Sequence, residues 1–347
     1  SWDVRPRLHA NGPADATAGE SSYAAELPEL VDDLVRRGIA EESDGALIVR
    51  LDDPEFGGLK EPVLIRKRDG GFLYATTDLA GIRRRVQKFH PHRLVYAIDA
   101  RQSLQMKQVY GASKKAGYTK NPVTGREVSF DHAAFGAILG DDGRPFKTRS
   151  GESVKLSDLL DETAARALAA VSSRSPDLPA AEARAIAEAV GMASLKYADL
   201  CNDRIKDYVF SFDRMLAFEG NTGPYLLYAL VRTRSIARKA GERGLGKGWE
   251  SAPYAVREPQ EKALALAILR YPATVRAVAE SLEPHRLCQY LYDLAGAFSS
   301  FFGADNCSVL EAENDATRNA RLRLCDLTAR VLQDGLRVLG IPTVDRM

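Results

Sequence analysis

The feature that most constrains this chain is a change of pattern near residue 155. Before it, short apolar runs alternate with segments of helical spacing, and after it only helical stripes continue. Strands alternating with helices of these lengths predict a mostly parallel α/β sheet, and the later stripes predict a helical bundle. The expected fold class is α/β followed by all-α. The 347 residues are enough for two or three domains with their own cores.

The first half carries a strong turn motif, Asp69-Gly70-Gly71, which predicts a β-hairpin. Asp78 is expected to cap the next helix, because an aspartate side chain accepts hydrogen bonds from first-turn amides. The predicted elements are helices 23–38, 78–89 and 102–116, and strands 46–51, 62–67, 72–77, 93–98 and 130–139. Ligands of parallel sheets bind at the carboxyl ends of strands, which here include Asp78 and Gln102.

A loop rich in glycine, hydroxyl and cationic side chains follows the last of these strands. Glycines let backbone amides approach a ligand, while hydroxyls and cations coordinate phosphate oxygens. Lys147, Arg149 and Ser150 are the residues of this loop that best suit a polyphosphate. A solvated surface loop of the same composition remains the alternative.

Charge and cysteine content exclude several classes. Lys plus Arg number 48 against 47 Asp plus Glu, so no global field indicates a nucleic-acid partner, and RNA contacts would need local patches. The four cysteines are far apart and form no CxxC pair, which argues against a zinc site or disulfide framework. No apolar run is long enough for a membrane span, and the start lacks a signal-peptide core. A cytoplasmic protein is expected.

The second half is predicted to be helical throughout. Helices are expected over 154–168 and 180–197, and four later prolines each stand just inside a helix start. Two apolar stripes predict bundle core. The prolines are Pro224, Pro259, Pro272 and Pro284; the stripes are Leu287, Leu291, Leu294 and Phe298, and Leu324, Leu327, Val331 and Val338.

Several long segments carry a family resemblance. The stretch FGAILGDDGRPFKTRSGESVKLSDLLDE resembles the mobile ATP loop of arginyl-tRNA synthetases, class I enzymes in which the usual KMSKS sequence is altered to something like FKTRSG. The segments GGFLYATTDLA, YAIDARQSLQMKQV and FEGNTGPYLLYALVRTRSIARKA also resemble family segments, in family order, as does the ending VLQDGLRVLGIPTVDRM. The likeness covers about residues 19–347.

The resemblance implies a domain organisation. Residues 21–155 would be the C-terminal part of a Rossmann-like class I catalytic domain, and 156–190 a helical connecting segment. Residues 191–347 would form an all-helical anticodon-binding domain of the DALR type. Residues 1–20, where the likeness fades, are expected to be an irregular leader.

Tyr74, Asp78 and Gln102 form the candidate arginine site. A guanidinium is planar, always charged and has five donors, so its pocket needs a carboxylate fork and a planar or aromatic neighbour. In the family, residues at matching places in the YATTD and DARQS segments contact the substrate arginine. Each residue also has a plain structural interpretation: Asp78 as a helix cap, Tyr74 as packing in the sheet and Gln102 as a helix start.

The resemblance also implies ATP as a substrate. His132 and Phe135 would lie against adenine, and Lys147 and Ser150 would contact ATP. Lys147 and Arg149 would act in catalysis by neutralising charge as pyrophosphate leaves. A structural role for His132 remains equally open. Mg²⁺ is implied by the family, although no acidic cluster in the sequence marks its site.

The tRNA interface is expected on the segment that follows Asn221-Thr222-Gly223-Pro224. Cations and aromatic rings suit phosphate contact and base stacking on single-stranded RNA, although a charged helix face is usually only solvated. The implied partners are arginine tRNA, L-arginine and ATP, and neither DNA nor a membrane. The candidate tRNA-binding residues are Tyr225, Tyr228, Arg232, Arg234, Arg238 and Met347.

The HIGH-type motif of class I synthetases does not occur in this sequence. His9-Ala10-Asn11-Gly12 shares only its first histidine and its glycine with that motif, so we treat the likeness as coincidence. The chain is therefore expected to be the C-terminal part of an arginine–tRNA ligase. Two alternatives remain open: a tRNA-binding relative without chemistry, and a nucleotide-binding α/β protein with a helical oligomerisation domain.

Overall fold

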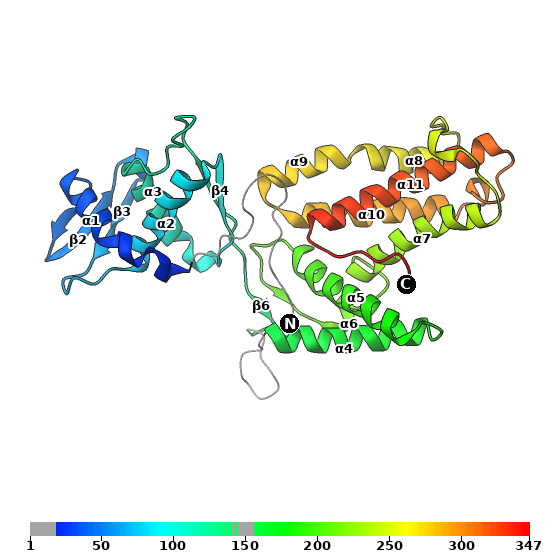
Figure 1. Ribbon diagram of the computed structural model, residues 1–347, viewed down its shortest axis with the longest axis horizontal. Coiled ribbons are helices and arrows are strands. Elements are labelled where there is room, and N and C mark those ends of the chain that lie inside the picture. Colours follow the sequence, from blue (N-terminus) through cyan, green and yellow to red (C-terminus); the bar gives the residue numbers. More distant parts are fainter. Residues whose placement is uncertain (1–18, 141–142, 145–155) are drawn as a thin grey trace. The chain divides into compact units, whose positions relative to one another are not determined.

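The structure is a computed structural model that describes residues 19–140, 143–144 and 156–347 (Figure 1). The chain divides into two compact units, Ser1–Phe135 and Gly136–Met347, here called the α/β unit and the helical unit. The irregular leader expected over 1–20 lies outside the described residues as far as residue 18. The fold class expected from the sequence, α/β and then all-α, is confirmed.

The α/β unit begins with a helix against a small sheet. A 3₁₀ turn, Glu20–Glu26, leads into α1, Leu27–Arg36, and Gly38 then ends the helix with φ 65°. The buried side chains of α1 pack against the sheet in one apolar core. The sheet has the order β1-β2-β3 and is antiparallel, although alternating strands and helices predict a parallel one. Its strands are β1 (Glu41–Ser43), β2 (Ala46–Leu51) and β3 (Leu59–Arg66), with a 3₁₀ turn at Pro54–Phe56.

The predicted hairpin turn forms, but its second strand does not. The Lys67 amide donates to the Gly71 carbonyl over 2.9 Å, and only Phe72 then bridges back to β3. Helix α2, Tyr74–Phe89, begins before Asp78, so the expected capping role of Asp78 is wrong. The buried Thr76 hydroxyl explains the early start, because it accepts from the Leu73 amide and donates to the Ile65 carbonyl.

A parallel strand pair and a third helix complete the α/β unit. Strand β4, Arg93–Tyr96, pairs with β5, Ser129–His132. Between them lie a 3₁₀ turn, Ala100–Gln102, and α3, Ser103–Lys115, which the sequence predicted well. A second, smaller apolar cluster lies between these strands and the two helices. The strand expected over 93–98 is less buried than predicted, since Val95 is 47% exposed.

The helical unit opens with a short strand rather than the long one expected over 130–139. After β5 the chain is irregular until β6, Ile138–Leu139, which pairs in parallel with β7, Tyr208–Val209. The alanine and glycine residues at 133–137 have low strand propensity, which explains the interruption. Strand β7 is also one that the helical pattern after residue 155 did not predict.

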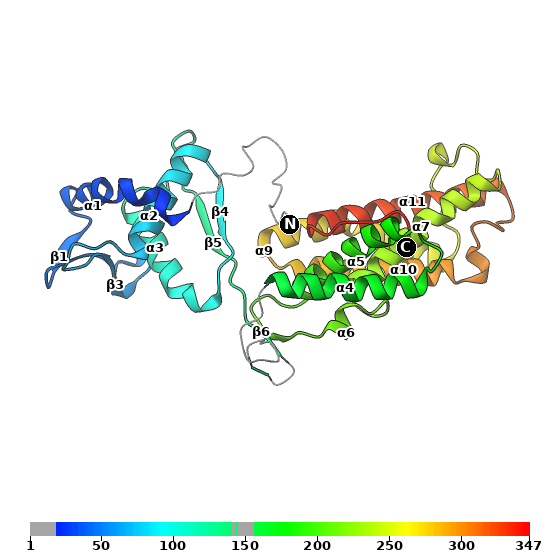
Figure 2. The same cartoon turned by 60° about the horizontal axis from the view of Figure 1, so that its bottom comes forward.

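The remaining elements are helices (Figures 1 and 2). Their buried side chains form a single apolar core. Helix α4 runs past its predicted end, and all four prolines stand in the first turns of helices as expected. Both predicted stripes are buried except at Leu327, which is half-buried, and Val338, which is exposed. The helices are α4 (Leu156–Arg174), α5 (Ala180–Leu200), α6 (Phe212–Met215), α7 (Gly223–Glu242), α8 (Pro259–Leu269), α9 (Tyr271–Ser281), α10 (Pro284–Phe302) and α11 (Asp315–Val338), with 3₁₀ turns at Trp249–Ser251 and Asp305–Cys307.

Within the described part of the chain, no helix combines the length and the apolar character needed to cross a membrane.

Candidate active site and nucleic-acid interface

The Asp78 carboxylate lies one helical turn after the start of α2 and meets helix α3. Gln105 Nε2 donates to Asp78 Oδ2 over 3.0 Å, and both side chains are half-buried. The two helices pack directly on each other. The position of the carboxylate is therefore set by helix packing and by a side-chain amide, which is the kind of support that orients a charged ligand group.

Tyr74 is the first residue of α2 and is 71% exposed. Its spacing of four residues from Asp78 places both side chains on the same face of α2. Gln102 is exposed and ends the 3₁₀ turn before α3. The amide that reaches Asp78 belongs instead to Gln105, one turn further along.

Sequence reasoning missed Gln105, although the segment DARQSLQMKQ offers three amides. Once α3 begins at Ser103, Gln102 and Gln105 lie on neighbouring positions of one face, three residues apart. The residue at which α3 begins therefore decides which of the two amides reaches Asp78. Helix boundaries are the least certain part of a sequence-based assignment.

Tyr96 at the end of β4 lies in the same electrostatic environment as Asp78. Arg85 Nη1 donates to the Tyr96 hydroxyl over 2.9 Å, and the guanidinium stands 5.5 Å from the ring centroid. Burial raises the pKa of Tyr96; Arg85 opposes this rise, and the Asp78 charge adds to it. Tyr96 is therefore neutral at physiological pH, and Arg85 already has an internal partner close to the candidate site.

Asp99 caps the 3₁₀ turn that leads from β4 to α3. Its carboxylate accepts from the Arg101 amide over 2.8 Å and from both Nε and Nη2 of the Arg101 guanidinium. These hydrogen bonds, the side-chain ones first, lower the pKa of Asp99 to about 2. The carboxylate is therefore ionised at neutral pH and occupied by Arg101.

His132 ends β5 and is held by two neighbours. Its Nε2 lies 3.0 Å from the Ile98 carbonyl oxygen, and its Nδ1 lies 3.4 Å from the Ser103 hydroxyl. These two distances place the His132 ring between β5 and the segment that leads from β4 into α3. Phe135 is 43% exposed and bridges to Asp99, so its ring remains accessible.

Three predicted ATP-loop residues, Lys147, Arg149 and Ser150, lie outside the described residues. Among the described residues, no group of three or more histidine, cysteine, aspartate or glutamate side chains could hold a metal ion. The described residues therefore do not place the Mg²⁺ that the family resemblance implies.

The arginines of α7 differ in what they contact. Arg232 lies 4.2 Å from the ring centroid of Phe302 and 6.0 Å from that of Tyr228. Arg234 Nη1 donates to Asp345 Oδ1 over 2.6 Å, next to the C-terminus. Arg238 is exposed, and no ion pair of its guanidinium is found among the described residues. Of these three arginines, Arg238 is therefore the one that could contact a ligand without losing an interaction found among the described residues.

The last residue lies against α7. Met347 and Tyr228 line one cavity of about 240 Å³. Arg174 also borders it, with its guanidinium 4.0 Å from the Phe218 ring centroid. Tyr228 is 45% exposed, whereas the Tyr225 ring packs 5.5 Å from that of Tyr292. The structure thus brings together two predicted tRNA-binding residues, Tyr228 and Met347, in a concave, partly cationic surface.

Two family models together match most of the chain. Residues 9–212 match the family described as "tRNA synthetases class I (R), catalytic domain", and residues 226–347 match the "DALR anticodon binding domain". The arginine–tRNA ligase of Salmonella typhimurium (strain SL1344) is 46% identical over 344 residues, or 98% of this chain. The chain belongs to the arginyl-tRNA synthetase family. The resemblance inferred from the sequence motifs is thereby confirmed.

Solved arginyl-tRNA synthetases share the fold. The Plasmodium falciparum enzyme matches with a TM-score of 0.78 and 26% identity, over 95% of this chain and 54% of its own. The Thermus thermophilus enzyme matches with a TM-score of 0.76 and 26% identity, over 93% of this chain and 58% of its own. The chain spans 58% of the length of the Salmonella relative. It thus corresponds to a part of these synthetases that carries catalytic-domain and anticodon-domain sequence together.

Proposed function

We propose that the complete protein is an arginine–tRNA ligase and that this chain supplies its arginine-recognising face and its anticodon-binding domain. The observation that carries the proposal is the Asp78 carboxylate, held by Gln105 and flanked on the same helix face by the exposed Tyr74. A half-buried carboxylate can accept paired hydrogen bonds from a guanidinium, and an aromatic side chain on the same helix face suits the planar cation.

The reaction has two steps. An oxygen of the arginine carboxylate attacks the α-phosphorus of ATP, the bond to the β-phosphate oxygen breaks, and pyrophosphate leaves with the electron pair. A hydroxyl of the terminal tRNA ribose then attacks the arginyl carbonyl, loses its proton, and AMP leaves. Asp78 and Tyr74 would hold the arginine side chain during both steps. Their contribution is orientation, which is worth up to about 7–11 kcal/mol of a barrier when two reactants are well placed.

Lys147 and Arg149 are proposed to neutralise the charge that develops on the phosphates. Lys147→Ala in the complete enzyme should lower the rate of adenylate formation more than it weakens ATP binding, because the charge matters most as pyrophosphate departs. Loss of ATP affinity with unchanged turnover would instead make the loop a ground-state clamp.

A second candidate function is RNA binding without chemistry by this polypeptide alone. The continuous core of the helical unit favours it, because that unit buries its own apolar side chains. We expect the isolated chain to bind arginine tRNA in a salt-sensitive manner, since its contacts would be mainly to phosphates. We expect it to show no arginine-dependent exchange of pyrophosphate into ATP.

Two assays on the isolated chain test these proposals. Robust exchange would show that the chain holds a complete adenylate site. Absence of tRNA binding at low salt would contradict the anticodon-domain assignment. In the complete enzyme, absence of arginine-dependent exchange with tRNA present would overturn the ligase proposal itself.

A further inference from the structure

The segment that leads into the proposed ATP loop has little support of its own. We call residues 136–139, which include strand β6, the loop root, because they run directly into the loop that begins at Gly140. Strand β6 has only two ladder pairs, both with β7. Two bonds flank them, from the Tyr208 amide to the Ala137 carbonyl over 3.2 Å and from the Phe210 amide to the Leu139 carbonyl over 2.9 Å. A ribbon this short is marginal without outside support.

The support comes from the turn before β7. The Gly136 amide donates to the Arg204 carbonyl over 2.7 Å, and the Ala137 amide donates to Asp207 Oδ1 over 2.6 Å. The approach is close: a Cβ on Gly136 would lie 2.8 Å from the Lys206 carbonyl carbon. Only glycine fits there, so the loop root lies directly on the backbone of this turn.

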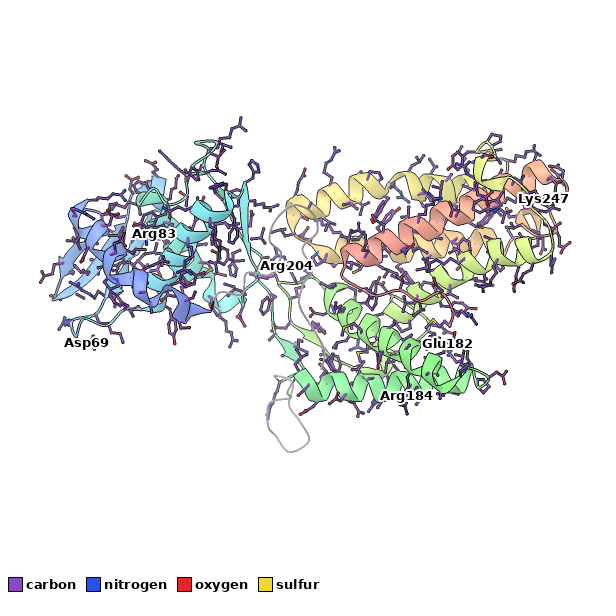
Figure 3. The ribbon with its side chains drawn as sticks, in the orientation of Figure 1. Asp69, Arg83, Glu182, Arg184, Arg204 and Lys247 are labelled. Carbon is purple, nitrogen blue, oxygen red and sulfur yellow. The ribbon has the colours of Figure 1, made fainter. Side chains whose placement is uncertain are left out.

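The Arg204 side chain joins the same turn to the helical bundle. Its Nε donates to the Leu282 carbonyl over 2.8 Å, and the residue is half-buried. Arg204 is labelled in Figure 3. Leu282 ends α9 in the left-handed conformation, with φ 56°, and stands just before α10. Helix α10 is anchored in the core by fully buried side chains such as Leu287 and Leu291. The carbonyl that Arg204 contacts is therefore held by the bundle.

We propose that Arg204 is a positioning residue for the ATP loop, because it ties the loop root to the α9–α10 turn. Arg204 acts through its own carbonyl and the Gly136 amide, so the position of the bundle's α9–α10 turn is transmitted to β6. The expected effect on catalysis rests on the proposed function. The structural link between Arg204 and the loop root does not.

The kinetic test uses Arg204→Ala in the complete enzyme, with arginine tRNA and saturating ATP present. We expect kcat of arginine-dependent pyrophosphate exchange to fall at least tenfold, while the KM for arginine stays within twofold, because Asp78 lies in the other unit. Arg204→Lys, which keeps a cationic donor, should recover most of the rate. A role in stability alone would lower the melting temperature and leave the kcat of the folded enzyme unchanged, and that result would overturn the proposal.

Arg214→Ala is the matched control. Arg214 Nη2 also donates to a backbone carbonyl of this ribbon, that of Val209, over 2.7 Å, but Arg214 belongs to α6. We expect less than a threefold change in kcat for this variant. An equal loss in both variants would show that any support of the ribbon suffices, and the specific link to the α9–α10 turn would then be wrong.

A second measurement does not depend on activity. Amide hydrogen exchange by NMR on this chain should quicken at least fivefold at Gly136, Tyr208 and Phe210 in Arg204→Ala, while the α10 core amides keep their rates. Unchanged exchange at these three amides would overturn the structural link. If the complete wild-type protein showed no arginine-dependent exchange of pyrophosphate, the proposed function would fail, and the amide rates would still decide whether Arg204 holds the loop root.

Discussion

The two units of this protein divide their buried side chains differently. The helical unit packs one continuous apolar core, whereas the α/β unit splits its core into a larger cluster around the β1-β2-β3 sheet and a small one beside the β4–β5 pair. Proteins with larger continuous cores bury a greater share of their surface and gain more from it. The helical unit is therefore expected to be the more stable of the two.

The charged groups of the two units also differ in how deeply they are buried. In the helical unit, Arg321 and Glu261 form an ion pair with side chains only 8% and 2% exposed. The remaining donors of Arg321 reach the Ser308 and Asn306 carbonyls over 2.7 Å each. Burial acts to raise the pKa of Glu261, but hydrogen bonds from backbone amides and from Arg321 outweigh it, so the pKa is lowered.

The charged and aromatic groups of the candidate arginine site are open by comparison. Tyr74 is largely exposed and Asp78 is only half-buried. A buried charge must be fully paired to be tolerated, whereas a charge that binds a ligand must keep capacity for it. Arg321 and Glu261 thus serve the internal structure of the helical unit, whereas Tyr74 and Asp78 lie nearer to solvent.

The largest expected effect comes from breaking the buried pair. Arg321→Met leaves the Glu261 carboxylate buried without its partner, which should lower the free energy of unfolding of the helical unit by about 3–5 kcal/mol. Denaturant-dependent hydrogen exchange, resolved by peptide, would measure this loss separately in each unit. We expect the α/β unit to keep its protection.

Arg330→Ala is the control for that measurement. Arg330 and Asp326 form a surface pair on α11, with the arginine 73% exposed, and such pairs contribute about 0–1 kcal/mol. If Arg321→Met lowered protection equally in both units, they would unfold as one cooperative body, and the contrast in stability between them would not hold.

Asp78→Asn tests the recognition side of the contrast. In the complete enzyme it should raise the arginine KM and lower kcat/KM at least tenfold, about 1.4 kcal/mol or more, because the amide cannot pair with a guanidinium charge. Asp99→Asn makes the same change in a carboxylate already occupied by Arg101, and should leave arginine kinetics nearly unchanged. Unaltered arginine kinetics in a folded Asp78→Asn enzyme would remove Asp78 from the site.

Gln105→Ala tests the support of the Asp78 carboxylate, and its expected effect is smaller. The loss of one hydrogen bond to the Asp78 carboxylate should lower kcat/KM for arginine by about tenfold or less, in line with about 0.5–1.5 kcal/mol for such a bond. Gln102→Ala is the comparison, and steady-state kinetics on both variants would rank them. A larger decrease in kcat/KM with Gln102→Ala would show that Gln102 contacts the substrate and that Gln105 has only a supporting role.

Sequence patterns predicted the helices better than the local geometry of the site. Helix α3 and the buried stripe of α10 follow from apolar spacing, which depends only on which side faces the core. The start of α2 was mispredicted because Thr76 and Thr77 have strand propensity. The buried Thr76 hydroxyl instead bonds the Leu73 amide and the carbonyl of Ile65, which lies eleven residues before Thr76 in the sequence. The partnership of Asp78 and Gln105 likewise depends on the packing of two helices, which no single segment encodes.

The same limit applies to the candidate tRNA-binding residues of α7. The sequence marks Arg232, Arg234 and Arg238 alike, because all three are cationic residues of one helix. Tertiary contacts then separate them: Arg232 lies against Phe302 and Arg234 against Asp345. Only the folded chain shows that these two cations have internal partners.

The smallest expected effect concerns the arginine that remains exposed. If the helical unit binds RNA through α7, Arg238→Ala should remove about one phosphate contact, so that the slope of log affinity against log salt falls in magnitude by about 0.7–0.9. Filter binding of arginine tRNA to this chain at several salt concentrations would measure that slope. Arg276→Ala removes an exposed arginine from α9 and controls for the general loss of positive charge. The same slope change in both variants would indicate a diffuse electrostatic attraction, and no change with Arg238→Ala would exclude this residue from the interface. A change confined to Arg238→Ala would place RNA on α7, close to Arg232 and Arg234, whose side chains contact Phe302 and Asp345.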